Sequence, residues 1–174
     1  MRYLDAGFES VVLISSDRTT VRKIYVPFHS STRWLAKYLR NFYACPTWQN
    51  PIAYHEHQIL KHLEKYDVAP ASTLNAHSID TKYAGNPIKS NQYIPRDILV
   101  KEGLRLFKGL QSAGIQHNDI RDENILFDGS KLTLIDFSVS DTPWLSISQS
   151  IPDLSWGRFG SNDRLLTLAA KDLH

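Results

Sequence analysis

The chain has 174 residues, of which 42% are hydrophobic and 22% are charged, a balance typical of a soluble globular protein with a hydrophobic core. Its formal net charge of +2 is too small to indicate a nucleic-acid-binding protein, and we expect no nucleic acid partner. The single cysteine, Cys45, excludes an intrachain disulfide and a cysteine-based zinc cluster within one chain. The sequence shows no signal-like or bilayer-spanning run, so we expect a cytoplasmic protein.

The first third of the chain predicts a strand hairpin followed by a helix. Residues 8–15 and 19–26 contain β-branched apolar residues bracketed by turn formers, which indicates two antiparallel strands that open the fold. The next segment, 27–51, is rich in aromatic and basic residues. Apolar residues at helical spacing within it predict a helix over about 31–42.

The middle of the chain predicts two further helices separated by strands. Residues 52–66 carry apolar residues on one helical face. Residues 72–83 predict one or two strands, and the turn formers at 84–87 predict a break between two lobes. Residues 95–113 predict another helix, and Gly114 stands where its end is expected.

The last third predicts a second, smaller hairpin and a closing helix. The predicted elements are a strand at 124–127, a turn at 128–130, a strand at 131–137, and a helix capped by Ser161 or Asn162 that runs to about Leu173. Strands and helices are thus segregated rather than alternating, which indicates the α+β class.

Residues 115–138 place many acidic and amide side chains between two apolar strips. Asp119 and Asn124 lie a short distance apart, and the predicted hairpin delivers Asp136 near Asn124, at the end of an apolar strand. Such hard oxygen ligands suit Mg²⁺ that completes its octahedron with water and substrate phosphate. His117 has no second histidine or cysteine at ligand spacing nearby, which favours Mg²⁺ over a transition metal. The alternative is a polar loop whose side chains cap turns.

Two motifs in this stretch resemble those of protein kinases. The segment H-N-D-I-R-D-E-N at 117–124 resembles the catalytic loop H-x-D-x-x-x-x-N, and I-D-F-S at 135–138 resembles the metal-binding D-F-G segment. The resemblance implies a minimal two-lobed protein-kinase-like fold that binds Mg-ATP in its cleft and transfers the γ-phosphoryl group to a hydroxyl. Its β-rich N-terminal lobe would span 1–84, including the insert 27–51, and its short, mainly helical C-terminal lobe would span 85–174.

The same resemblance implies a role for each residue of the two motifs. Asp119 would orient or deprotonate the acceptor hydroxyl, and Arg121 would stabilise the transferring phosphoryl group. Asn124 and Asp136 would hold Mg²⁺. Ser138 replaces the final glycine of D-F-G, which removes a flexible hinge and indicates a site that does not toggle.

The N-terminal lobe of a kinase supplies the groups that hold the nucleotide. Lys23, in V-R-K, is similar to the strand lysine that holds the α- and β-phosphates, and Glu56 would be the helix partner that orients it. Gly7 and Ser10, in G-F-E-S-V-V, stand where the glycine-rich phosphate loop is expected. This segment departs from G-x-G-x-x-G because it keeps one glycine, although backbone N–H groups can still approach phosphate there.

The acceptor hydroxyl is predicted from looser similarities. Only 36 residues follow Ser138, so the chain resembles minimal microbial kinases rather than eukaryotic ones. The basic, tryptophan-containing segment, the E-x-x-x-L helix and the V-x-P exit are similar to lipopolysaccharide core kinases that phosphorylate Kdo or heptose. The RIO and KEOPS-type atypical protein kinases are the alternative, with a protein hydroxyl as acceptor.

Three further possibilities remain open. Residues 33–48 interleave bases with aromatics, which suits peripheral contact with an anionic membrane surface, although these aromatics could instead pack the small lobe. The reduced glycine loop is also compatible with a nucleotide-binding pseudokinase. Transfer of AMP instead of a phosphoryl group is a third possibility.

Overall fold

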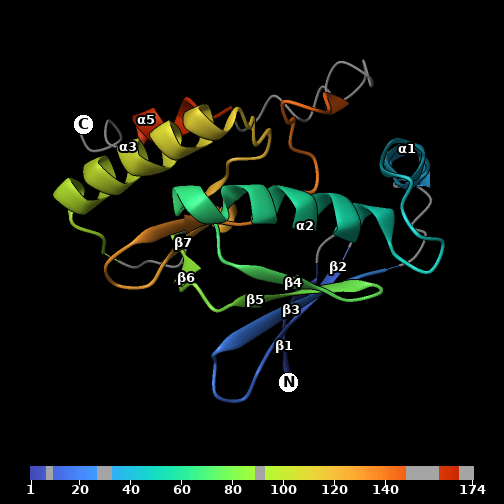
Figure 1. Cartoon of the computed structure of the whole chain (residues 1–174). Coiled ribbons are helices and arrows are strands. Elements are labelled where there is room, and N and C mark those ends of the chain that lie inside the picture. Colours follow the sequence, from blue (N-terminus) through green and yellow to red (C-terminus); the bar gives the residue numbers. More distant parts are fainter. Residues whose placement is uncertain (7–9, 27–32, 89–92, 148–160, 169–174) are drawn as a thin grey trace. The chain divides into compact units, whose positions relative to one another are not determined.

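Figure 1 shows the computed structural model of the chain, which describes residues 1–6, 10–26, 33–88, 93–147 and 161–168. The chain divides into two compact units. Unit 1 consists of residues 1–61 and 71–83, and unit 2 of residues 62–70 and 84–174. Both contain antiparallel sheet and helix, so the α+β class is confirmed. No helix within the described residues is both long and apolar enough to cross a bilayer.

Unit 1 is built on a five-stranded antiparallel sheet with the order β1-β2-β3-β5-β4. Its strands are β1 (Arg2–Ala6), β2 (Ser10–Ile14), β3 (Thr20–Tyr25), β4 (Ser72–Leu74) and β5 (Ser78–Lys82). The predicted hairpin and the strands after residue 71 are confirmed. The prediction that the hairpin opens the fold was wrong, because β1 precedes it and pairs with β2. A five-residue strand with a polar, mixed sequence carries little periodicity of its own, and its pairing with β2 defines it.

Helix α2 (Pro51–Leu63) lies over one face of this sheet, with His57 on the helix bonded to Ser72 on β4 (Figure 1). The helix begins where Asn50 accepts hydrogen bonds from the backbone N–H groups of Ile52 and Ala53, at 2.9 and 3.3 Å. This N-cap satisfies two donors of the first turn, and Pro51 at the first helical position needs no acceptor. The prediction of a helix over 52–66 is confirmed, with its last residues forming the 3₁₀ turn η1 (Glu64–Tyr66).

Helix α1 (Arg33–Tyr43) carries two kinds of apolar side chain. Leu35 and Leu39 are buried, one helical turn apart, whereas Trp34 and Phe42 are exposed. Trp48, beyond the helix, is 61% exposed. The leucines therefore belong to the core, whereas the described aromatic residues of this segment are exposed or, for Tyr38 and Tyr43, half-buried.

Unit 2 is built on helix α3 (Arg96–Ala113) and a three-stranded antiparallel sheet with the order β6-β7-β8. The strands are β6 (Asn86–Pro87), β7 (Ile125–Phe127) and β8 (Leu132–Leu134). Helix α3 ends at Gly114, whose φ of 69° is the left-handed conformation that a helix-ending glycine adopts readily, so this prediction is confirmed.

A short helix, α5 (Arg164–Thr167), packs on α3 through Gly103, where an added Cβ would lie 2.8 Å from the carbonyl oxygen of Leu165. Leu165 is buried with Leu106 and Leu110 of α3. The predicted closing helix was to extend to about Leu173, but residues 169–174 lie outside the described residues. The apolar core of unit 2 thus includes buried residues of α3 and α5, and the same unit contains the loop at 115–124 and the segment after β8.

Candidate functional site

His117 is a buried hub between the 117–124 loop and the segment that follows β8. Its Nδ1 accepts a hydrogen bond from the backbone N–H of Asp119 at 3.3 Å, and its Nε2 lies 3.0 Å from the carbonyl oxygen of Ile135. Since Nδ1 accepts, the proton that Nε2 donates fixes the neutral tautomer. The ring also packs on Phe137, with centroids 4.4 Å apart. His117 therefore links the 117–124 loop to the segment that follows β8.

Two residues of this site hold a backbone conformation that is uncommon outside glycine. Asn118 has φ of 65° and Asp136 has φ of 66°, both in the left-handed region. Asn and Asp tolerate this region better than other residues, at a cost of order 1 kcal/mol or more each. Asn118 is held there by a hydrogen bond from its Nδ2 to the carbonyl oxygen of Val139, at 3.0 Å. Left-handed residues of this kind cluster at functional sites because they aim side chains that a regular strand would direct elsewhere.

The Asp119 carboxylate is held by two neighbours from the same loop. Asn124 donates from Nδ2 to both the carbonyl oxygen and Oδ2 of Asp119, each at 2.9 Å. Arg121 donates to Oδ2 at 2.8 Å. Burial raises the pKa of the Asp119 carboxyl above its ordinary value, and the nearby Asp136 carboxylate raises it further, while Arg121 and Asn124 offset part of the rise. The Asp119 carboxylate is therefore partly desolvated and held in one orientation by Asn124 and Arg121.

Asn124 and Asp136 are brought together by the short hairpin of β7 and β8. The backbone N–H of Ile135 donates to the carbonyl oxygen of Asn124 at 3.1 Å, and Ser138 Oγ donates to Asp136 Oδ1 at 3.3 Å. The prediction that Asp136 ends the apolar strand was wrong in detail, because β8 ends at Leu134. The left-handed turn at Asp136 breaks the ladder and turns the carboxylate toward the loop that carries Asp119.

The donor set of this site consists of oxygens. Asn124 directs its amide nitrogen at Asp119, so its carbonyl Oδ1 is the atom that can act as a ligand together with the Asp136 carboxylate. Within the described residues, no three His, Cys, Asp or Glu side chains form a metal-holding group. Two protein oxygens fit a cation such as Mg²⁺, which keeps several waters or substrate oxygens, and do not fit a closed all-protein cage.

The Lys23 and Glu56 pair lies in unit 1. Lys23 on β3 donates from Nζ to Glu56 Oε2 on α2 at 2.8 Å, with 18% and 5% of the two side chains exposed. The sequence therefore identified two residues, 33 positions apart, that form a buried ion pair. Ser10 is the buried first residue of β2, opposite Tyr25. Gly7 lies outside the described residues.

Two residues that support the loop were not predicted as such. Asn162 is buried; its Oδ1 accepts from the backbone N–H of His117 at 3.1 Å, and its Nδ2 donates to the carbonyl oxygen of Ile115 at 2.7 Å. Ser140 Oγ donates to the carbonyl oxygen of His117 at 3.0 Å. The prediction that Asn162 caps the last helix through its side chain was wrong, because that side chain is used by the loop, and the residue before α5 makes no side-chain cap.

Asp122 and Asp128, two further acidic residues of the stretch, make contacts that hold the fold. Asp122 pairs with Arg164 of α5 at 3.1 Å. Asp128 accepts from the backbone N–H groups of Ser130 and Lys131, at 2.8 and 2.9 Å, in the turn between β7 and β8. These hydrogen bonds outweigh burial and lower the pKa of the Asp128 carboxyl.

Comparison with known proteins gives one local similarity to a kinase. No protein-family model matches the chain. The chain is similar to "Putative serine/threonine-protein kinase 040L" of Invertebrate iridescent virus 3, with 53% identity over 34 residues. The matched stretch is 20% of this chain and 10% of the viral protein, so the chain spans about a tenth of the length of that relative. The similarity is to part of a protein whose name places it among the kinases.

Proposed function

We propose that the protein is an ATP-dependent phosphotransferase of the protein-kinase-like class, which moves the γ-phosphoryl group of Mg-ATP to a hydroxyl. The observation that carries the proposal is the convergence of Asp119, Asn124 and Asp136, with Asp119 partly desolvated and oriented by Asn124 and Arg121. A turn-capping loop needs no second carboxylate beside the first. The kinase name of the viral relative supports the same class.

The chain's own residues divide the work of such a reaction. Lys23, oriented by Glu56, would hold the α- and β-phosphates. Asp119 would accept the hydroxyl proton as the acceptor oxygen bonds to the γ-phosphorus and the bond to the ADP oxygen breaks. Its raised pKa makes it a stronger base than an ordinary aspartate. Arg121 would stabilise the negative charge on the transferring group.

Asn124 and Asp136 would hold Mg²⁺ through Oδ1 and a carboxylate oxygen. When bound, the ion would neutralise phosphate charge and align the phosphates. Ser138 would keep the Asp136 carboxylate in a single orientation through its 3.3 Å hydrogen bond.

The acceptor is a protein or a sugar hydroxyl. A protein serine or threonine is favoured by the name of the viral relative. A lipopolysaccharide core sugar rests on the basic, aromatic segment at 33–48 and is the second candidate. Transfer of AMP in place of a phosphoryl group, and nucleotide binding without turnover, are the outcomes that would replace this proposal.

Mass spectrometry of candidate acceptors tests the proposed function. The protein is incubated with Mg-ATP and either a generic serine- and threonine-rich protein or a core oligosaccharide, with a non-hydrolysable ATP analogue as control. We expect a phosphate mass gain on one acceptor with ATP and none with the analogue. An AMP mass gain would change the reaction class. Nucleotide binding with no ATP consumption in the presence of every acceptor would indicate a pseudoenzyme.

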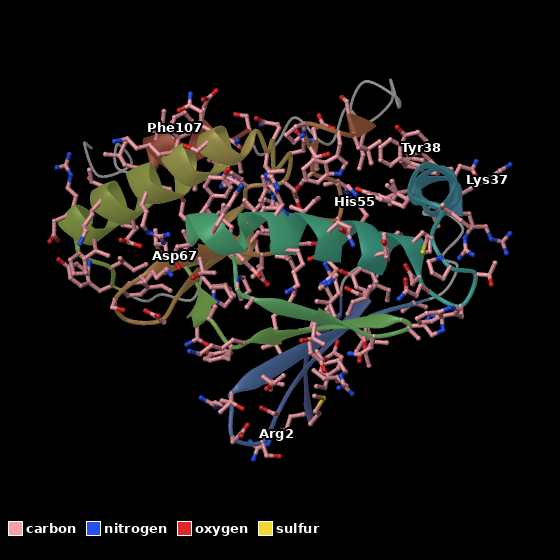
Figure 2. All side chains as sticks on the ribbon, in the orientation of Figure 1. Arg2, Lys37, Tyr38, His55, Asp67 and Phe107 are labelled. Carbon is pink, nitrogen blue, oxygen red and sulfur yellow. The ribbon has the colours of Figure 1, made fainter. Side chains whose placement is uncertain are left out.

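We also propose that the exposed part of 33–48 contacts an anionic phospholipid bilayer. Trp34 and Trp48 are exposed, as are the bases Arg33 and Lys37 of the same segment, and Lys37 extends from α1 into solvent (Figure 2). No acidic residue occurs between Asp17 and Glu56 in the sequence. Exposed tryptophans with lysine and arginine suit the headgroup region of an anionic surface.

Vesicle co-sedimentation checks this contact. The double variant Arg33→Gln/Lys37→Gln should bind phosphatidylserine-containing vesicles roughly thirtyfold more weakly, because two basic residues at about 1 kcal/mol each contribute about 2 kcal/mol. The charge-matched control Lys82→Gln/Lys101→Gln removes two exposed lysines from other elements and should bind as the unsubstituted chain does. Equal binding to neutral and anionic vesicles, or none to either, would contradict the proposal.

A further inference from the structure

Tyr25 contacts the Lys23 and Glu56 pair although no sequence pattern singles it out. It is the last residue of β3 and is fully buried. Its hydroxyl donates to Glu56 Oε2, the same oxygen that accepts from Lys23 Nζ at 2.8 Å. Lys23 and Tyr25 are two residues apart on one strand, so both point to the same face of the sheet. The Lys23 ammonium also lies 5.1 Å from the centre of the Tyr25 ring.

The Tyr25 hydroxyl restricts the orientation of the Glu56 carboxylate, which the ion pair with Lys23 alone does not fix. Glu56 and Lys23 both have long, flexible side chains, and an ion pair between them can form in several geometries. A tyrosine packed in the core has only two side-chain torsions, so its hydroxyl stands at a fixed point. By donating to Oε2 from that point, Tyr25 restricts the Glu56 carboxylate, and the carboxylate in turn restricts the Lys23 ammonium.

We propose that Tyr25 is a positioning residue, whose hydroxyl holds the Glu56 carboxylate so that Lys23 stands ready before any nucleotide binds. What Lys23 then does rests on the proposed function, but its placement by Tyr25 does not. The pair would be assembled permanently, because one of its supports belongs to the central strand of the unit 1 sheet rather than to a movable segment.

Tyr25→Phe separates this role from simple packing. Phenylalanine keeps the ring that fills the core and faces the Lys23 ammonium, and it removes only the hydroxyl. Tyr43→Phe is the matched control, because the Tyr43 hydroxyl also bonds to α2, at 2.7 Å from Nδ1 of His55, the neighbour of Glu56. A general loss of helix support would affect both variants, whereas a loss of Glu56 positioning would affect Tyr25→Phe alone.

Two measurements report on the position of the Lys23 ammonium. The first is the rate at which an amine-reactive reagent labels Lys23, read by mass spectrometry without nucleotide and normalised to the exposed Lys82. A carboxylate at hydrogen-bond distance favours the unreactive ammonium form, so Tyr25→Phe should be labelled several-fold faster. The second is the dissociation constant of a non-hydrolysable ATP analogue, which should rise about tenfold, as expected for one hydrogen bond to a charged group.

The variant Glu56→Gln completes the test. If the hydroxyl acts through the Glu56 charge, Tyr25→Phe should add no further increase in Lys23 labelling to the Glu56→Gln chain. Additive effects of the two substitutions, or wild-type labelling in Tyr25→Phe, would overturn the positioning role. Failure of the unsubstituted chain to bind the analogue would instead overturn the proposed function, while the labelling rates would still decide the role of Tyr25.

Discussion

The substitution Asp136→Asn is expected to abolish phosphoryl transfer while the fold is retained. Asparagine has the same size, tolerates the left-handed conformation at φ of 66°, and can still accept the hydrogen bond from Ser138. What it loses is the negative charge that would hold Mg²⁺. Because metal charge stabilisation contributes several kcal/mol to such reactions, we expect turnover to fall by roughly a thousandfold or more.

Turnover and metal-dependent stabilisation together check this prediction. The increase in melting temperature caused by Mg²⁺ with an ATP analogue should be smaller in Asp136→Asn, because a ligand that binds more weakly stabilises the folded state less at the same concentration. Asp128→Asn is the control on the same hairpin, because Asp128 serves only the turn and asparagine can accept the same hydrogen bonds. Full activity of Asp136→Asn would show that the metal assignment is wrong.

The substitution Asp119→Asn should lower the turnover number by about a hundredfold to ten-thousandfold, the range typical of a general base. The dissociation constant of the nucleotide should change little, because Asp119 is assigned to the acceptor hydroxyl and not to the phosphates. Asp128→Asn, in the turn between β7 and β8, is the control and should retain turnover. A rise in the dissociation constant with an unchanged turnover number would contradict the assignment of Asp119.

We expect the ionisation of Asp119 to determine how both kcat/KM and the stability of the fold depend on pH at acidic pH. Its pKa is raised in the fold, so the acid limb of kcat/KM should lie above the pH of about 3.9 at which an ordinary aspartate titrates. Between the unfolded and folded pKa values the folded chain binds more protons, and its stability therefore falls as pH rises through this window. Asp119→Asn removes the buried charge, so it should be at least as stable as the unsubstituted chain at neutral pH.

The residues that were predicted from the sequence share one property: the proposed phosphoryl transfer requires particular residue types at these positions and at these spacings. Asp119, Asn124 and Asp136 lie within 18 positions of one another, and the short hairpin of β7 and β8 brings the ends of this stretch together. Lys23 and Glu56 required the additional expectation of a helix over a sheet, which the resemblance to kinases supplied. Their ion pair is observed, while their action on a nucleotide stays a prediction.

The residues that the sequence did not identify depend on tertiary contacts. Asn162 reaches the loop from 45 positions beyond His117, and its role is set by where α5 packs on α3. In the sequence, Tyr25 resembles an ordinary apolar strand residue, and only the structure shows its hydrogen bond to Glu56. The position of Asp136 outside β8 was missed for a related reason, since an apolar run gives no sign of a left-handed residue inside it.

Asn162 and Ser140 bind the two backbone polar groups of one residue, the N–H and the carbonyl oxygen of His117. The backbone of the loop is therefore held at His117 by side chains from two segments that follow it in the chain. An opening of residues 161–168 would release the backbone of His117 and, with it, the Asp119 carboxylate two residues later. In terms of local unfolding, we expect residues 161–168 and the 117–124 loop to open together, so that an event that loosens α5 would disturb Asp119 without contacting it.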